Sequence, residues 1–275
     1  MATLLVERFD RFGLPFQIFG APSDRLWALE ARFPGRTTSR LEEIAYDEWL
    51  VALKTNQNEA KIRTLRGGRP RAILVLQNGL GPERQWATLS SQVGRALSTY
   101  GVKSIAPGRI EGGEFGEMTV VEGSPFFAPL SAAGFRVRMV GSMDGAIWRK
   151  LAVNASLNVV AALYGVENGR VLEIPEAFRL TRLASQEVEE VARASGVPWG
   201  SRSAWETTRS VARGTSRNIC STLGDIRAGR TTEYDAINGE VLAVADRLNL
   251  VVPTLRHLDI AFRDLVGQNL RTVCA

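Results

Sequence analysis

The stretch Ala-Ile-Trp-Arg-Lys-Leu-Ala-Val-Asn-Ala-Ser-Leu-Asn, residues 146–158, decides how the chain divides, because long helical patterns begin there. Its polar residues Lys150, Asn154 and Asn158 recur at a spacing of four. On an α-helix these positions form one ridge, turned by about 40° per step, on a surface that is otherwise mostly apolar. A solvent-facing stripe is one explanation. Two asparagines are poor helix formers and good hydrogen-bonding groups, however, and they favour a binding ridge.

Upstream of this stretch the chain alternates short apolar runs with helical patterns, as a parallel sheet with crossover helices does. The runs cover residues 15–19, 49–53 and 72–76, and the helical patterns cover residues 24–32 and 57–65. Nearly continuous apolar runs are typical of strands that are buried on both faces. Between residues 102 and 140 glycine and proline interrupt short strands, and we expect antiparallel strands that finish the sheet.

Downstream of Gly141 the chain is predicted to be helical to its end, with helices at residues 145–163, 175–195, 201–225 and 233–248. Thr231 or Thr232 would cap the last of these, and Pro253 marks a stop after it. The predicted fold class is therefore α/β followed by all-α. We expect a sheet domain at residues 1–141, a helical domain at residues 142–275, and a ligand-binding cleft between them.

The composition argues against several classes of protein. The net charge of +5 does not indicate a nucleic-acid binder, because 29 acidic residues are interspersed with the basic ones. No apolar run is long enough to span a membrane, and the N-terminus lacks the pattern of a signal peptide, so we expect a cytoplasmic protein. Cys220, Cys274 and His257 are too few for a disulfide framework or a metal site, and Cys220 is expected to be a small buried residue.

Lysine is rare in this chain. Arginine dominates the 34 basic residues, and the only lysines are Lys54, Lys61, Lys103 and Lys150. Arginine holds its proton at any ordinary pH, whereas a partly desolvated lysine can give one up. Lys150 stands on the predicted ridge and is therefore a candidate proton donor. A second segment, residues 218–239, places small polar residues before an acidic helix start, and a loop with a helix cap explains it as well as a site does.

Taken together, these residues resemble the ketopantoate reductase family. The resemblance rests on the block at residues 148–154 with Asn158 and Asn168-Gly169, on Ser221 through Ile226, and on Thr-Glu-Tyr-Asp and Ile-Asn-Gly within residues 232–239. In the first half it rests on Leu-Gln-Asn-Gly-Leu-Gly at residues 76–81 and Ala-Leu-Lys at residues 52–54 with Gln57. The motifs come in the family's order and cover residues 45 to 260.

The resemblance implies a Rossmann-type NADP-binding domain joined to a helical domain like that of 6-phosphogluconate dehydrogenases. It implies NADPH-dependent reduction of 2-dehydropantoate (ketopantoate), a small 2-keto acid, to pantoate in pantothenate and coenzyme A biosynthesis. Lys150 matches the catalytic proton donor, and Glu233 matches a glutamate that orients the lysine and the nicotinamide ribose. The matching substrate contacts are Asn154, Asn158, Asn168, Ser221, Thr222, Leu223 and Gly224, and the matching cofactor contacts are Lys54, Gln57, Asn78 and Val102.

The sequence departs from the family at its N-terminus. The family's Gly-x-Gly-x-x-Gly turn, which cradles the cofactor pyrophosphate, has no counterpart there. Residues 2–12 match the helix that follows that turn, and residues 16–19 match the second strand, so the chain is expected to start one strand and one turn late. Arg25, in preference to Ser23, is expected to select the 2′-phosphate of NADP.

Two other functions stay open. A chain without the glycine turn could be a catalytically impaired member that serves as a ligand-binding or structural module. A sibling reductase for another 2-keto acid would share the carboxylate and keto contacts. The residues do not decide between a monomer and a homodimer, and they do not name the physiological substrate.

Overall fold

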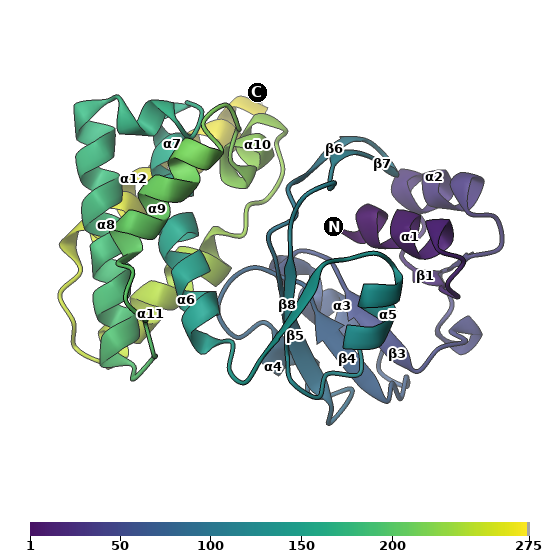
Figure 1. Ribbon diagram of the computed structural model, residues 1–275. Helices are drawn as coiled ribbons and strands as arrows, with labels where there is room; N and C mark the ends of the chain where they lie inside the picture. The colour runs from purple at the N-terminus through teal and green to yellow at the C-terminus, as the bar shows by residue number, and fades with distance from the viewer. Residues whose placement is uncertain (274–275) are drawn as a thin grey trace. The chain divides into compact units, whose positions relative to one another are not determined.

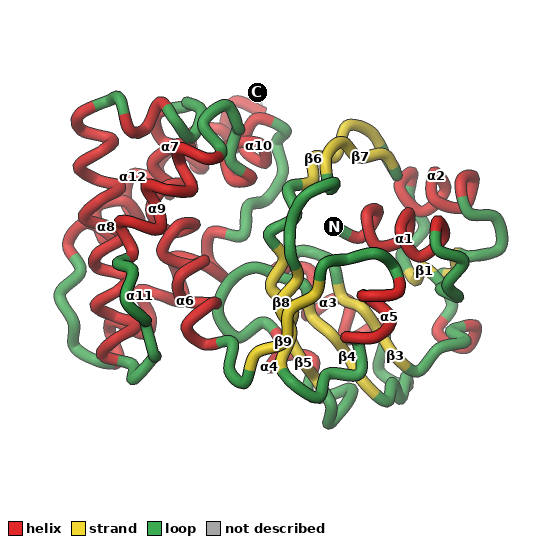
Figure 2. The backbone as a smooth tube through the Cα atoms, viewed as in Figure 1, coloured by secondary structure: helices red, strands yellow, loops and turns green. Residues whose placement is uncertain are grey.

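The computed structural model describes the backbone of residues 1–273 and the side chains of residues 1–267. The chain forms two compact units, the first from Met1 to Met143 and the second from Asp144 onward. The first unit contains the sheet and the second is helical (Figures 1 and 2). Cys274, which the sequence analysis considered for a disulfide or metal site, lies outside the described residues.

The first unit is built around a five-stranded sheet with the order β3-β4-β5-β8-β9. Strands β3, β4 and β5 run parallel, β8 is antiparallel to β5, and β9 is parallel to β8. Two further sheets have two strands each, β1-β2 and β6-β7. The strands are β1 (Ile18–Phe19), β2 (Thr37–Thr38), β3 (Glu48–Val51), β4 (Ala72–Val75), β5 (Val93–Ser98), β6 (Val102–Ala106), β7 (Arg109–Gly112), β8 (Met118–Val121) and β9 (Val137–Val140).

Helices cover both faces of the five-stranded sheet, as the continuous apolar run at β4 predicts. Ala72 and Leu74 pack with residues of α1 and α5 on one face, and Ile73 and Val75 pack with residues of α3 and α4 on the other. Alternate side chains of one strand thus enter two different cores. The helical segments of this unit are α1 (Ala2–Arg11), α2 (Asp24–Arg32), η1 (Leu41–Glu43), η2 (Thr55–Gln57), α3 (Asn58–Thr64), α4 (Glu83–Trp86) and α5 (Phe127–Ala132).

The strands after residue 101 confirm in part the prediction that antiparallel strands finish the sheet. β6 and β7 form a separate antiparallel pair, because the glycines around them turn the chain back on itself: Gly108 and Gly112 have φ of 67° and 87°. β8 and β9 finish the main sheet and run in the opposite direction to β3, β4 and β5. α5 connects β8 to β9, and a crossover of this kind returns the chain parallel to the strand it left.

The first forty residues are held to the unit chiefly by side chains. α1 forms as the sequence predicts, and Leu4, Leu5 and Phe9 of α1 join the core on the sheet. The strand expected at residues 15–19 is shorter than predicted and pairs with β2, outside the five-stranded sheet. Arg8 donates to Gly134 O at 2.5 Å and Gly113 O at 2.7 Å. Before β1, Gln17 Nε2 donates to Glu43 O and Gln17 Oε1 accepts from Ala45 N, both at 2.9 Å. The side-chain amide thus forms the two bonds that a neighbouring strand would form through its backbone.

The second unit is a helical bundle around α8. Its segments are α6 (Asp144–Val153), η3 (Asn154–Asn158), α7 (Val159–Tyr164), η4 (Arg170–Leu172), α8 (Pro175–Ala194), α9 (Ala204–Gly214), α10 (Ser221–Arg227), η5 (Asp235–Gly239), α11 (Glu240–Arg247) and α12 (Pro253–Val273). α6, α7, α9, α11 and α12 all contact α8. The buried Glu187 of α8 accepts bonds from Thr254 N and Leu255 N, both at 2.8 Å, and thereby caps the first turn of α12.

Two helix predictions in this unit are corrected. The single helix expected at residues 201–225 is two helices, α9 and α10, because Asn168 pairs with the intervening loop through Thr215 and Asn218. Pro253 does not end the helical region: it is the first residue of α12, where its missing N–H and fixed φ are compatible with a helix start. Within the described residues, none of the helices is both long and apolar enough to cross a membrane.

Candidate functional site

The predicted ridge of Lys150, Asn154 and Asn158 spans a change in helix type. Lys150 lies in α6, whereas Asn154 and Asn158 are the first and last residues of η3, which is a π-helical turn. A helix of one type was expected through residues 145–163. π turns inside α-helices are uncommon and occur frequently at functional sites, because the extra residue redirects the side chains around it.

The π turn straightens the ridge. Four residues of an α-helix overshoot a full turn by about 40°. A π-helix has about 4.4 residues per turn, so four residues fall short of a full turn by about 30°. Asn158 therefore returns to within about 10° of Lys150 around the helix axis, where a continuous α-helix would place it about 80° away. Lys150 and Asn158 therefore project in nearly the same direction, and Asn154 lies between them about 40° to one side.

The two asparagines of the ridge are linked. Asn158 Nδ2 donates to Asn154 Oδ1 at 3.2 Å, which orients both amides. Because its oxygen is engaged, Asn154 has an NH₂ group to offer to a carbonyl or carboxylate oxygen. Asn158 is buried, and Asn154 and Lys150 are half-buried, so the ridge lies at the edge of the apolar interior. Partial desolvation of this kind strengthens directed hydrogen bonds.

The start of α10 lies beside the ridge. Cys220 precedes α10 and accepts a bond from Leu223 N, while its thiol donates to Asn158 O, both at 3.4 Å. Burial raises the pKa of the Cys220 thiol, which keeps it protonated and able to donate. Cys220 is thus a helix cap as well as the small buried residue that the sequence suggested. The first turn of α10 contains Ser221, Thr222, Leu223 and Gly224, of which Ser221 is exposed and Leu223 is buried.

Glu233 lies just before the second π turn, η5, which contacts η3. Its neighbour Tyr234 is fixed by stacking on Phe262 at 4.1 Å between ring centroids and by donating to Asp259 Oδ1 at 3.1 Å. Burial raises the pKa of Tyr234, so the hydroxyl remains a donor. The backbone beside Glu233 is therefore anchored on α12, two residues before the element that contacts the π turn of the ridge.

Asn168 is less directly connected to the ridge. It follows α7, is buried, and donates through Nδ2 to Thr215 Oγ1 at 2.8 Å. Its own N–H donates to Asn218 O at 3.0 Å. The structure thus places Asn168 where it fastens the loop that leads into α10, rather than in line with Lys150.

In the first unit the predicted cofactor residues follow the carboxyl ends of β3 and β4, the edge at which parallel sheets bind ligands. Lys54 and Asn78 are both half-buried, and Thr55 Oγ1 donates to Asn78 O at 3.3 Å, which joins the two strand ends. Gln57 is exposed, and its side chain accepts a bond from Lys54 N at 3.4 Å, so it also caps the short helix η2.

Buried polar side chains hold the backbone at this edge of the sheet in place. Gln77 and Asn58 exchange two amide bonds at 2.6 and 3.0 Å, and Gln77 also donates to Leu53 O at 2.9 Å. Arg95 of β5, only 6% exposed, donates to Gln77 O at 3.2 Å and Gly79 O at 2.5 Å. Asn78 is therefore held between two braced carbonyl groups. Nothing in the sequence distinguishes Arg95 from the other arginines as part of this edge.

The loop after β4 also has the backbone of a ligand loop. Gly79 and Gly81 have φ of 98° and 69°, in the region that favours glycine. The chain turns sharply there and brings backbone N–H groups close to the strand end. Glycine turns, an amide and a half-buried lysine at this edge fit a dinucleotide cofactor.

The remaining predicted cofactor residues lie elsewhere in the first unit. Arg25 is an exposed residue of α2 and donates to Thr3 Oγ1 in the first turn of α1 at 3.4 Å. The Ser23 side chain caps α2 by accepting a bond from Leu26 N at 3.3 Å, which leaves Arg25 as the better anion ligand of the two. Val102 begins β6, outside the five-stranded sheet.

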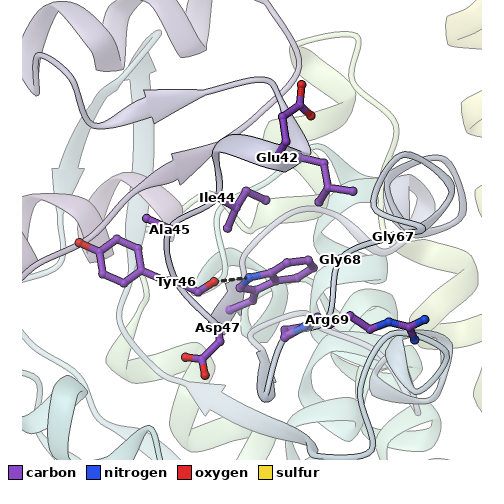
Figure 3. A pocket seen from close by; sticks show the side chains of 11 residues that line it. Glu42, Ile44, Ala45, Tyr46, Asp47, Gly67, Gly68 and Arg69 are labelled. Carbon is purple, nitrogen blue, oxygen red and sulfur yellow. Dashed lines mark hydrogen bonds between the residues drawn. The ribbon is translucent and has the colours of Figure 1, made fainter.

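A hollow of about 450 Å³ lies at the opposite edge of the sheet, where β3 and β4 begin (Figure 3). The segment before β3 and the loop before β4 line it, and the Trp49 indole donates to Tyr46 O at 2.9 Å inside it. Parallel sheets bind ligands at the carboxyl ends of their strands. We therefore place the candidate cofactor site at Lys54 and Asn78, and not in this hollow.

Comparison with known proteins identifies two matching family models. A model described as ketopantoate reductase PanE/ApbA matches residues 18–125, and one described as ketopantoate reductase PanE/ApbA C terminal matches residues 142–261. A 2-dehydropantoate 2-reductase from Pyrobaculum aerophilum is 33% identical over 210 residues, which are 76% of this chain and 73% of the relative.

Solved structures show the same fold. A PanE/ApbA family ketopantoate reductase from Ralstonia eutropha JMP134 has a TM-score of 0.86 at 23% identity, over 97% of this chain and 95% of that one. A D-mandelate dehydrogenase solved with NADH and anilino(oxo)acetate has a TM-score of 0.84 at 15% identity, over 96% of this chain and 95% of that one. The two-unit architecture is therefore the one that these reductases and dehydrogenases have.

Proposed function

The chain belongs to the ketopantoate reductase family, and from this premise we propose that it reduces 2-dehydropantoate to pantoate with NADPH. This reaction would serve pantothenate and coenzyme A biosynthesis in the cytoplasm. The name of the 33% identical relative supports the reaction. The choice of NADPH over NADH is our inference from the exposed Arg25, whose guanidinium suits a 2′-phosphate.

The observation that carries the proposal is the straightened ridge. A 2-keto acid has a carboxylate and a carbonyl oxygen on neighbouring carbons, so a site that recognises it needs donors in a short row. Lys150, Asn154 and Asn158 supply an ammonium and two amides in such a row. On a continuous α-helix the same residues would diverge.

The proposed chemistry assigns one task to each group of residues. The bound nicotinamide supplies the hydride that reduces the keto carbon. Lys150 Nζ donates a hydrogen bond to the keto oxygen and then transfers its proton there as negative charge develops, so the product is the alcohol and a neutral amine that solvent reprotonates. Glu233, two residues before the element that contacts η3, orients Lys150 in this proposal.

Substrate and cofactor are held by different groups of residues in this proposal. The amides of Asn154 and Asn158 and the first turn of α10, with Ser221, bind the carboxylate and hydroxyl of the substrate. Lys54 and Asn78 at the strand ends contact the cofactor, and Gln57, Val102 and Arg25 complete its site. Asn168 contributes by fixing the loop before α10.

Steady-state kinetics with the purified 275-residue protein test the proposal. We expect NADPH oxidation that depends on ketopantoate, with kcat/KM at least about tenfold lower for NADH. Calorimetry with NADPH alone separates binding from turnover. NADPH binding without turnover would support the impaired ligand-binding member instead, and absence of both would overturn the proposal.

A second candidate is a sibling reductase that acts on another 2-keto acid. The similarity in fold to a D-mandelate dehydrogenase that was solved with NADH and anilino(oxo)acetate supports this candidate. Assays that compare ketopantoate with aromatic and branched 2-keto acids decide between the two. A kcat/KM higher for benzoylformate than for ketopantoate would favour the sibling.

A further inference from the structure

The π turn η3 depends on side chains from other elements. A π turn moves backbone bonds from the i→i+4 to the i→i+5 register, and carbonyls near the change of register need additional donors. Ser156, inside η3 and fully buried, serves one of them by donating to Ala152 O at 2.5 Å. The other donors come from further along the chain.

Asn238 of η5 supplies the second donor. Its Nδ2 donates to Ala155 O at 3.0 Å, and the side chain is 2% exposed. This bond joins the middle of one π turn to the middle of another, 83 residues away. Because the site is buried, a lost donor would leave the carbonyl without water to replace it.

Cys220 supplies the third donor, at the end of η3. Its thiol donates to Asn158 O while its sulfur caps α10 by accepting from Leu223 N. One side chain therefore sets both the end of the π turn and the start of α10. Serine offers the same pair of bonds with a stronger donor, and alanine offers neither.

We propose that Asn238 and Cys220 are positioning residues, which hold η3 in its π form and thereby keep Asn158 in line with Lys150. The inference rests on the proposed function for its effect on substrate, but the holding of the turn is a separate property of the chain. Without these donors, the extra residue can shift to a following turn, so that residues 154–158 take up the α register while the end of α7 keeps its packing. That change rotates Asn158 by about 70° away from Lys150.

The main test uses Asn238→Leu, which removes the amide and nearly preserves side-chain volume. We expect the KM for ketopantoate to rise about 10- to 100-fold, because small misplacements of binding groups have effects of that size. The Kd for NADPH should stay within about twofold. Hydrogen–deuterium exchange of residues 154–160 should become about tenfold faster, as the loss of one net bond predicts.

Leu258→Val is the matched control. Leu258 is fully buried in α12, which packs on α7 and α8, so the change loosens the same core without removing a donor to η3. It should lower the unfolding temperature and leave the KM for ketopantoate and the exchange of residues 154–160 unchanged. A rise in KM of the same size in this variant would show that general loosening explains the effect.

Cys220 provides an independent arm. Cys220→Ser should keep the wild-type exchange rate of residues 154–160 and a KM for ketopantoate within about twofold of wild type. Cys220→Ala should raise the exchange rate and this KM by about tenfold each. Equal behaviour of the serine and alanine variants would overturn the role of Cys220.

The readouts separate the inference from the proposed function. If the wild-type protein does not reduce ketopantoate, the proposed function fails, and exchange in Asn238→Leu still decides whether η3 is held. If the wild-type protein is active but Asn238→Leu changes neither exchange nor KM, the inference fails alone.

Discussion

Lys150 is the residue on which the proposed chemistry depends most. We expect Lys150→Ala to lower kcat about 10²- to 10⁴-fold, because general acid catalysis contributes that much, while the Kd for NADPH stays nearly unchanged. Stopped-flow hydride transfer and NADPH fluorescence measure the two effects. Lys103→Ala, at an exposed lysine of β6, is the matched control and should behave as wild type. Near-normal turnover of Lys150→Ala would remove Lys150 from the role of proton donor.

Arg25 is the residue that we propose to determine cofactor choice. Arg25→Ala should raise the KM for NADPH about tenfold, since a charge-assisted bond to phosphate is lost, and should leave the KM for NADH unchanged. Arg66→Ala, at an exposed arginine of the segment after α3, controls for a general change in charge. If Arg25→Ala raises the KM for NADPH and the KM for NADH equally, another residue binds the 2′-phosphate.

Arg95 joins β5 to the loop after β4 at the candidate cofactor edge, so its effect belongs to the element scale. Arg95→Lys keeps the charge but cannot reach both Gln77 O and Gly79 O in the same geometry. We expect a Kd for NADPH about tenfold higher and a KM for ketopantoate close to wild type. Arg71→Lys, at an exposed arginine before β4, is the control. An unchanged Kd would show that the loop after β4 holds its shape without Arg95.

Glu30 fastens α2 to β2 and makes this joint sensitive to pH. Its carboxylate accepts from Thr37 Oγ1 at 2.6 Å and from Gly35 N at 2.7 Å, and these bonds lower the pKa of Glu30. The stabilisation is fully present above the pKa of the unfolded chain, about 4.3, and is lost as the pH falls through the lower folded value. The unfolding temperature of Glu30→Gln should therefore be lower than that of the wild type at pH 7. The difference between the two unfolding temperatures should shrink below about pH 4. A constant difference down to pH 2.5 would contradict this prediction.

Local patterns predicted many elements well. α2 begins and ends at the expected residues, because Ser23 caps it and its apolar positions follow a helical period. The run 72–76 became β4 for a similarly local reason. The separation of β6-β7 from the main sheet was not predictable, because an alternating strand carries no information about which partner it finds.

The candidate site was predictable in its residues but not in its geometry. A spacing of four marks one side of an α-helix and of a π turn almost equally well, so Lys150, Asn154 and Asn158 gave no sign of the π turn. In the sequence, Asn238 and Cys220 cannot be told from ordinary buried residues. Their hydrogen-bond partners are backbone carbonyls more than sixty residues away. Because every residue has a backbone carbonyl, the sequence does not indicate which carbonyl a side chain will bind.

At the scale of the whole molecule, cofactor binding should stabilise the native chain. With NADPH at a hundred times its Kd, linkage predicts about 2.7 kcal/mol, and therefore a rise in unfolding temperature of roughly 5–10 °C for a protein of this size. Differential scanning calorimetry measures the shift. NADH at the same concentration should give a smaller one, and an equal shift would argue against NADPH as the preferred cofactor.

The π turn also bears on how this chain can change over generations. An α-helix that gains one residue without breaking absorbs it as a π turn, so η3 has the form of an old insertion. Deleting one residue there would restore a continuous α-helix, because five π-helical residues and four α-helical residues turn the chain by nearly the same angle, about 410° and 400°. α7 would keep its orientation relative to α6, and the fully buried Val160 and Ala161 would stay in the core. The bundle therefore does not need the extra residue for its packing, and its loss would change the ridge alone.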